Sequence, residues 1–377
     1  MGVKLVQLAK GKIIGTGDIH LEELVPVDTN VPTTYVKKWP CGKTQDDKVT
    51  AYLTGTSGNY SLHIYGSGEM QNYTGYNDAP WSSYRVKHFI AHTGITAIGN
   101  YCMAGDTNGG NLRDIVLANT VRVIGIAAFN TKNTNITSIE LPNGVRHIRN
   151  TAFAELSGVN SISIPDSVRR IDNNAFKNVP WFTSQTDATV VAGNGVLLKM
   201  NSQAANRVIP DGVKFISGLG SNSLITSLTF PYGLKGIGRF ACDGMVNLTS
   251  LVLPDTITWL GTACLRGFCG ETINIPLSLK RIPSRMLLNC SAFSHIYIPH
   301  TIAEIWTWEH GDNTAESGAF ANGAPFFGCS GNLHIYCESE QKPTGWDEYW
   351  DYISSSQRAT VHWGVSRTAY ETSIGGE

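Results

Sequence analysis

Hydrophobic residues recur along this chain in a fixed pattern. Two aliphatic residues flank one other residue, proline follows, and two more aliphatic residues stand three and six positions after the proline. Six segments share the strand and proline part of the pattern: Ile139–Pro142, Ile162–Pro165, Leu228–Pro231, Leu251–Pro254, Ile273–Pro276 and Ile296–Pro299. An earlier copy, Ile115–Ala118, has alanine in place of proline. Within uninterrupted runs the prolines are 22 or 23 residues apart. A period this regular predicts stacked copies of one structural unit.

Each copy is typical of a short strand followed by a tight return. Alternation with a period of two indicates a strand, and proline ends it because proline has no N–H to donate to a ladder. One such unit cannot bury its aliphatic side chains alone, whereas stacked units bury them against their neighbours. We therefore expect a mainly β solenoid whose core is shared between turns.

Two further features extend the repeat. A small residue and a second core residue recur ten and eleven positions after the proline position of the repeat, and we interpret these pairs as core filling rather than a ligand site. They are Ala128-Phe129, Ala152-Phe153 and Ala175-Phe176, then Ala241-Cys242 and Cys264-Leu265. Between Pro165 and Pro210 the spacing doubles, so residues 177–208 are expected to hold one irregular turn. Its Gly193-Asn194-Gly195 predicts a hairpin.

The strings SISIPDSVRRIDNNAF, SIELPNGVRHIRNTAF and LVLPDTITWLGTAC resemble the BspA-like leucine-rich repeats. That family has Ile-Pro, Val, Ile-Gly and Ala-Phe at these offsets, and the resemblance covers roughly residues 86–340. It implies a leucine-rich-repeat solenoid with a period of about 22–23 residues, an N-terminal β segment and a C-terminal cap. The expected division is an attachment or extended segment at 1–35, a β segment at 36–85, the solenoid at 86–336, and a cap and tail at 337–377.

Three departures from the repeat affect its local register. Arg207 stands where an inward aliphatic is expected, and Ser221 replaces the phenylalanine before Pro231. A polar insertion, WEHGDNTAESGAF, interrupts the last turn. They leave the fold assignment unchanged, because the repeat resumes on both sides.

Composition narrows the classes of partner. Charged residues make up 16% of the chain, against roughly 25% in typical globular proteins, and 39 glycines indicate a turn-rich β protein. A net charge of −1 gives no overall basic field, so nucleic acid is not expected as a partner. The sequence contains no stretch of eighteen apolar residues, so membrane insertion is not expected. The amino terminus lacks the pattern of a Sec signal peptide, so that route of export is not expected.

Motifs for catalysis are not found in the sequence. The eight cysteines form no CxxC pair and are expected to be buried free thiols. His295, His300, His310 and His334 follow no metal-binding spacing. The sequence also lacks a Gly-x-Ser-x-Gly elbow, a Walker loop and an HExxH motif. We therefore expect no enzyme activity, no cofactor and no metal.

A ligand surface is expected where strand side chains point outward. These positions form a hydroxyl-rich row that becomes aromatic and histidine-bearing toward the carboxyl end, and tryptophan and tyrosine are common anchors of ligands. The predicted ligand-binding residues are Thr272, Asn274, His295, Tyr297, Trp306, Trp308, His334, Trp346 and Trp350. Two alternatives stay open: a solvated sheet face for the row, and a lid over the last turn for the tryptophans.

The BspA-like resemblance implies a role among surface adhesins, and similar arrays occur in protist and phage proteins. We expect a non-catalytic recognition protein that binds a protein or glycan on a cell surface. Its expected location is extracellular, at a cell surface, or on a virion as a tail or head fibre, with residues 1–35 attaching it to a larger assembly. The alternative is a purely structural subunit of a virion or surface layer. A hydrolase would require a pocket with convergent carboxylates.

Overall fold

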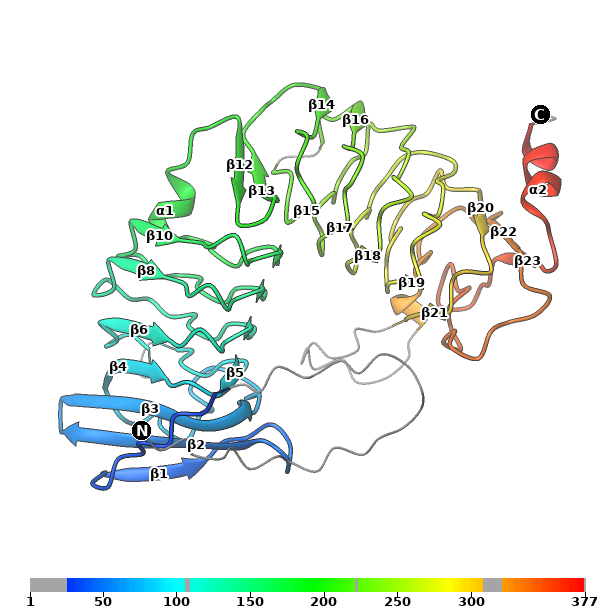
Figure 1. Ribbon diagram of the computed structural model, residues 1–377. Coiled ribbons are helices and arrows are strands. Elements are labelled where there is room, and N and C mark those ends of the chain that lie inside the picture. Colours follow the sequence, from blue (N-terminus) through cyan, green and yellow to red (C-terminus); the bar gives the residue numbers. More distant parts are fainter. Residues whose placement is uncertain (1–25, 106–108, 221–222, 308–320, 376–377) are drawn as a thin grey trace, which may run out of the picture.

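The computed structural model describes residues 26–105, 109–220, 223–307 and 321–375. These residues form a β solenoid of about eleven turns that curves into an arc, with the amino-terminal strands at one end and the carboxyl-terminal helix at the other (Figure 1). The prediction of a mainly β leucine-rich-repeat solenoid is confirmed.

An antiparallel unit closes the amino-terminal end of the arc. Strands β1 (Lys37–Pro40), β2 (Lys48–Thr56) and β3 (Asn59–Glu69) pair in sequence order. The long strand β3 then pairs in parallel with both β4 (Val86–Ala91) and β5 (Ile95–Ile98). One strand thus starts both ladders of the solenoid, and its buried side chains seal the first turn.

The proline-ended strands lie on the outer side of the arc. In β8 (Ser138–Glu140), β10 (Ser161–Ser163) and β16 (Ser227–Thr229) the middle aliphatic is buried and both neighbours are exposed, as the period of two predicts. Figure 1 shows β6, β8, β10, β14 and β16 along this side. The remaining outer strands are β6 (Asp114–Leu117), β14 (Asn206–Val208), β20 (His295–Ile298), β22 (His334–Cys337) and β23 (Thr360–His362).

A second set of strands, mostly two residues long, lines the concave side of the arc (Figure 1). These inner strands pair in parallel between successive turns, and their second residue is the buried aliphatic six positions after the proline. They are β7 (Val123–Ile124), β9 (His147–Ile148), β11 (Arg170–Ile171), β15 (Phe215–Ile216), β17 (Gly236–Ile237), β18 (Trp259–Leu260), β19 (Arg281–Ile282) and β21 (Glu304–Ile305).

The irregular turn lies where the sequence predicts it. Strands β12 (Thr189–Ala192) and β13 (Val196–Met200) form an antiparallel hairpin around Gly193-Asn194-Gly195, with Ala192 opposite Val196. It follows the short helix α1 (Pro180–Thr183). The hairpin coincides with a division of the buried side chains into two hydrophobic clusters, one on each side of it. Strand β13 continues the inner ladder by pairing with β15.

Stacked aromatic rings fill the first half of the core. Phe129, Phe153 and Phe176 lie nearly parallel, with ring centroids 5.5 and 5.9 Å apart, and Trp181 closes the stack edge-on. The prediction that the Ala-Phe pairs fill the core is confirmed, since both Ala152 and Phe153 have no exposed surface.

Cysteines and one arginine occupy other buried positions of the repeat. All eight cysteines are free thiols and six are buried. Burial raises the pKa of Cys242 to about 12, so this thiol stays protonated and inert at neutral pH. Arg207 is buried in place of an aliphatic residue and its Nη1 donates to the carbonyl oxygen of Leu219 over 2.8 Å. Ser221 and the polar insertion before residue 321 lie outside the described residues.

We expect Phe153→Ala to lower the free energy of unfolding by about 3–5 kcal/mol, because it leaves a cavity inside the ring stack. Chemical denaturation followed by circular dichroism measures the change. Ser163→Ala in an adjacent turn is the control and should change stability by less than about 0.5 kcal/mol, since Ser163 is exposed on an outer strand. Equal effects of the two substitutions would contradict the role of the stack.

Candidate binding site

The concave face is built from one repeated tetrapeptide. In each turn an aliphatic residue is followed by two variable residues and then by the buried aliphatic of the inner strand. The second variable residue is the first residue of the inner strand, and in six of these turns it is partly exposed on the concave side, whereas Phe215 and Gly236 are buried. The successive tetrapeptides are VRVI at 121–124, VRHI at 145–148, VRRI at 168–171, VKFI at 213–216, LKGI at 234–237, ITWL at 257–260, LKRI at 279–282 and IAEI at 302–305.

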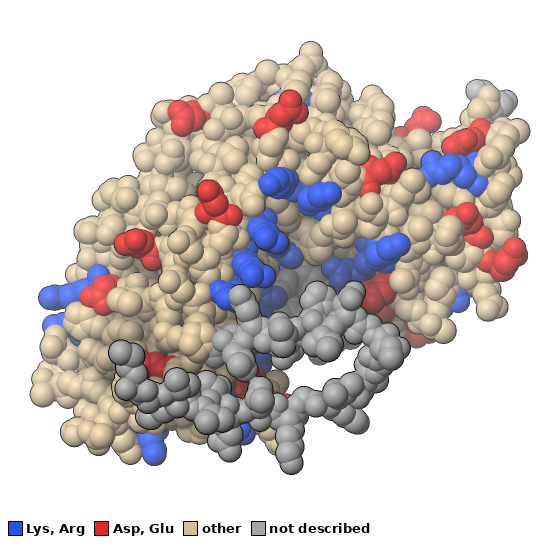
Figure 2. Space-filling model, in the orientation of Figure 1, with Lys and Arg blue, Asp and Glu red and all other residues tan. Residues whose placement is uncertain are grey.

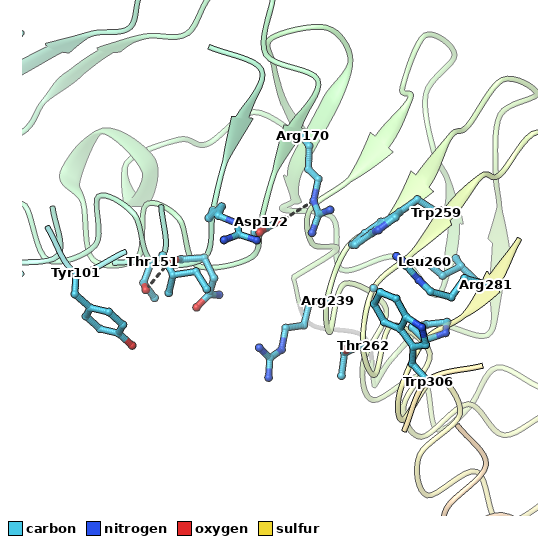
Figure 3. Close-up of a pocket in the computed structure, with 15 residues that line it drawn as sticks. Tyr101, Thr151, Arg170, Asp172, Arg239, Trp259, Leu260, Thr262, Arg281 and Trp306 are labelled. Carbon is cyan, nitrogen blue, oxygen red and sulfur yellow. Dashed lines mark hydrogen bonds and ion pairs between the residues drawn. The ribbon is translucent and has the colours of Figure 1, made fainter. Parts of the chain in front are cut away.

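A hollow of about 230 Å³ lies on this face and is lined from both halves of the solenoid. Figure 3 shows Tyr101 and Thr151 on one side, Trp259 and Trp306 on the other, and Arg239 between them. Pockets that enclose a drug-sized ligand have roughly 300–1,000 Å³. The hollow therefore fits one small group of a ligand whose remainder lies along the concave face.

An ion pair between the partly exposed Arg170 and the buried Asp172 forms one wall of the hollow. Nε of Arg170 donates to Oδ1 of Asp172 over 2.7 Å, and Nε2 of His147 lies 3.0 Å from Oδ2. Burial opposes the charge on Asp172, but attraction to His147 and Arg170 outweighs it and holds the pKa of this carboxyl well below its usual range. Burial also lowers the pKa of His147. At neutral pH the arginine is thus the permanent cationic partner of Asp172.

The guanidinium of Arg170 also stacks on an aromatic surface. Its Cζ lies 3.7 Å from the ring centroid of Trp259 and 5.8 Å from that of Phe215. The two rings are 5.6 Å apart and cover the intervening turn, where Gly236 has no side chain. A Cβ at Gly236 would lie 3.0 Å from the Phe215 ring. Glycine at this position therefore allows the aromatic surface to form.

A second arginine stacks in the same way one turn further along. Cζ of Arg281 lies 3.8 Å from the ring centroid of Trp306, as the paired side chains in Figure 3 show. Burial lowers the pKa of Arg281, and the charge of Arg170 lowers it further against the opposing effect of Glu304. Among the described residues, Arg281 has no hydrogen-bond acceptor. The hollow thus contains a half-buried guanidinium whose N–H donors are open to an anionic ligand.

More cations follow the same inner strands. The first variable residue of the tetrapeptide is basic in six turns, and these residues are partly or fully exposed: Arg122, Arg146, Arg169, Lys214, Lys235 and Lys280. Figure 2 shows Lys and Arg side chains gathered along the inner side of the arc, whereas Asp and Glu are scattered over the outer surface in view. The net charge of −1 therefore conceals a basic concave face, which the sequence analysis missed.

The predicted ligand-binding residues separate into different environments. Trp306 lines the hollow, where its ring faces Arg281. Trp308 lies outside the described residues. Trp346 and Trp350 are only 3% and 2% exposed, with ring centroids 4.6 Å apart. They form the lid over the last turn, the alternative that the sequence left open, and present almost no surface to a ligand.

Three other predicted residues, Thr272, His295 and Tyr297, lie beneath or beside the carboxyl-terminal helix α2 (Arg367–Ile374). Its Tyr370 has its hydroxyl 3.2 Å from Oγ1 of Thr272, and its ring centroid is 5.4 Å from that of Tyr297 and 6.1 Å from that of His295. Tyr297, expected to face outward, is 5% exposed because α2 covers it. Nδ1 of His334 lies 2.9 Å from Nε2 of His362, on the neighbouring strand β23.

Asn274 has a structural partner. Its Oδ1 accepts from the main-chain N–H of Leu253 over 2.8 Å, and its Nδ2 donates to the carbonyl oxygen of the same residue over 2.7 Å. The side chain thereby links two turns at a point where no outer strands are formed. These contacts account for Asn274 without a ligand.

Comparison with known proteins agrees with the repeat. The family described as "BspA type Leucine rich repeat region" matches residues 77–189 and 220–309 in six copies, together more than half of the chain. The chain belongs to this family. No curated protein matches it.

Several solved structures resemble this BspA-type protein at low identity. A leucine-rich repeat protein from Eubacterium ventriosum is 19% identical, with a TM-score of 0.35 over 85% of this chain and 96% of that one. The pneumococcal vaccine antigen PcpA is 12% identical, with a TM-score of 0.32 over 86% and 98%. A leucine rich cell surface protein from Faecalibacterium prausnitzii is 14% identical, with a TM-score of 0.30 over 90% and 98%. The family assignment therefore depends on the repeat match alone.

Across residues 26–105, 109–220, 223–307 and 321–375 of this BspA-type chain, no three or more His, Cys, Asp or Glu side chains are arranged to hold a metal ion. No helix in those parts is long and apolar enough to cross a membrane.

We expect Asp172→Asn to lower the free energy of unfolding by about 1.5–3 kcal/mol at pH 7, because it weakens a charged hydrogen bond. The folded-state pKa of Asp172 is depressed, so its contribution is full above the unfolded value of about 3.9 and is lost as pH falls below it. The difference between wild type and variant, measured by denaturation from pH 7 to pH 3, should shrink below about pH 4. Asp166→Asn, at an exposed carboxylate, is the control. A difference independent of pH would contradict the assignment.

Proposed function

We propose that this protein is a non-catalytic recognition protein displayed on a cell or virion surface, and that it contacts its ligand through the concave face. The observation that carries the proposal is the hollow with two arginines stacked on tryptophans, Arg170 on Trp259 and Arg281 on Trp306. Arginine and tryptophan are the residue types most enriched among those that dominate binding energy. Membership of a leucine-rich-repeat family agrees with a binding role.

The chemistry of the hollow favours binding over hydrolysis. Asp172 is the only carboxylate among its described lining residues, and it is engaged by Arg170. Hydrolysis of a glycosidic bond typically needs two carboxylates on opposite sides of the bond. The stacked guanidiniums of the hollow instead supply N–H donors in fixed positions. Such donors suit a site that binds a ligand and releases it chemically unchanged.

Binding of the labelled chain to bacterial and animal cells tests the proposal. We expect Lys280→Gln combined with Arg281→Gln to weaken saturable binding at least tenfold, because Arg281 lines the hollow and Lys280, the residue before it, is an exposed cation of the same turn. Arg113→Gln combined with Lys177→Gln removes two charges from exposed positions that do not line the hollow and should leave binding unchanged. Circular dichroism and thermal melting show whether each variant remains folded.

Two outcomes would count against the proposal. If the wild-type chain binds no cell type, the result favours the alternative that the protein is a purely structural subunit of a virion or surface layer. If both double variants bind as the wild type does, the ligand contacts another surface, and the concave face is not the recognition site.

A further inference from the structure

The side chains of the concave face indicate the class of ligand that it binds. This inference rests on the function proposed above. Three features of this face need a common explanation. The hollow contains a guanidinium whose N–H donors are open to an anion, neutral hydrogen-bonding groups line the same hollow, and a line of cations extends along the inner strands beyond the hollow.

The first feature is the state of Arg281. Its guanidinium lies over the Trp306 ring with Cζ 3.8 Å from the ring centroid, half-buried and without an acceptor among the described residues. Arg170 is held on Trp259 at 3.7 Å, and its one hydrogen bond to Asp172 uses Nε, which leaves the two terminal nitrogens. Planar guanidinium groups held in this way match the two oxygens of a carboxylate, or those of a sulfate.

The second feature is the neutral polar wall. Asn150, Thr151 and Thr262 line the same hollow as the two stacked arginines. Amide and hydroxyl groups next to cations suit a ligand that carries hydroxyl groups beside its acid group, which is the chemistry of an acidic sugar. The hollow volume of about 230 Å³ admits a small group of this kind rather than a whole ligand.

The third feature is the line of cations along the inner strands. Neighbouring strands of a β sheet lie about 4.8 Å apart, so the basic residues Arg146 and Arg169 of adjacent turns repeat at about that interval. Lys214 and Lys235 continue the line in the second half. A polymer with an acid group at regular intervals contacts several of these cations at once, whereas a single small anion contacts one or two.

These features also distinguish the acidic sugar polymer from single-stranded nucleic acid. Nucleic-acid channels combine a basic groove with aromatic faces on which bases stack. In this protein the guanidinium of Arg170 lies over one face of Trp259, and the guanidinium of Arg281 lies over one face of Trp306. The tryptophans therefore serve to position arginines, and the groups that remain for a ligand are N–H donors and hydroxyls.

We propose that the concave face binds an acidic polysaccharide, with one carboxylate or sulfate group held in the hollow by Arg170 and Arg281 and neighbouring acid groups on the line of cations. The test uses the purified full chain in calorimetric titrations against polygalacturonate, dextran sulfate, neutral dextran, poly-glutamate and oligo-dT. The first two probes distinguish a carboxylate from a sulfate source.

Polygalacturonate or dextran sulfate should bind with an affinity that falls as salt rises, while neutral dextran should not bind. Arg281→Gln should weaken binding about tenfold. Arg281→Lys keeps the charge but loses the planar fork, so it should weaken binding nearly as much. Trp306→Leu removes the surface that orients Arg281 and should weaken binding about threefold or more, although no charge is changed.

Several results would overturn the inference. One is failure of both acidic polysaccharides to bind. Another is tighter binding of oligo-dT or poly-glutamate than of either polysaccharide, which would assign the face to nucleic acid or to an acidic peptide. A third is unchanged affinity in Arg281→Gln, or full retention in Arg281→Lys, which would indicate unspecific charge attraction.

The inference and the proposed function fail in different ways. If cells bind through the hollow but no acidic polysaccharide does, recognition stands and the ligand class is wrong. If the polysaccharides bind the hollow but the Lys280→Gln, Arg281→Gln double variant binds cells as the wild type does, the ligand class stands and the role of this face in cell recognition is wrong.

Discussion

The stacking of each turn on the next is the constraint on which the rest of this structure depends. A turn holds only a few aliphatic side chains, and they are removed from water only when the neighbouring turns cover them. Both strands of the repeat must therefore keep their buried residue in register with the turn before and the turn after. Ile148 opposite Ile171, and Ile237 opposite Leu260, show this register in the inner ladder. Once the buried residue is fixed, the direction of its neighbour is fixed too, so the repeat that builds the core also aligns Arg170, Trp259 and Arg281 on one face.

The sequence predicted the fold well because its signal is local and repeated many times. Prolines 22 or 23 residues apart, the Ala-Phe pairs and the hairpin at Gly193-Asn194-Gly195 each reflect a requirement of one turn, and the structure contains all of them. The candidate site was predicted only at Trp306. The tetrapeptides VRHI, VRRI and LKRI hold the missed signal, since they place one or two arginine or lysine residues between the two buried aliphatics. Net charge concealed it, because acidic residues elsewhere cancel these cations in the sum.

The remaining differences come from contacts between residues far apart in the chain. Tyr297 alternates as an outward residue should, yet Tyr370 of α2 covers it from a position more than seventy residues later. No periodicity in the sequence contains that contact. The approach of Arg170 to Trp259 is equally distant, because it crosses the irregular turn and a glycine whose missing side chain opens the space. Such pairings follow from the curvature of the whole arc, whereas repeat patterns describe one turn and its nearest neighbours.

The hairpin of β12 and β13 has a consequence for how the molecule responds to load. It coincides with the border between two hydrophobic clusters, so the buried side chains of the arc form two packed blocks that meet at this point. Trp259 belongs to the second half of the chain but packs against the first cluster, and Arg170 meets it from the other side. The concave hollow thus spans the joint between the blocks. A ligand held there would act as a brace across the joint, resisting a pulling force that tends to straighten the arc.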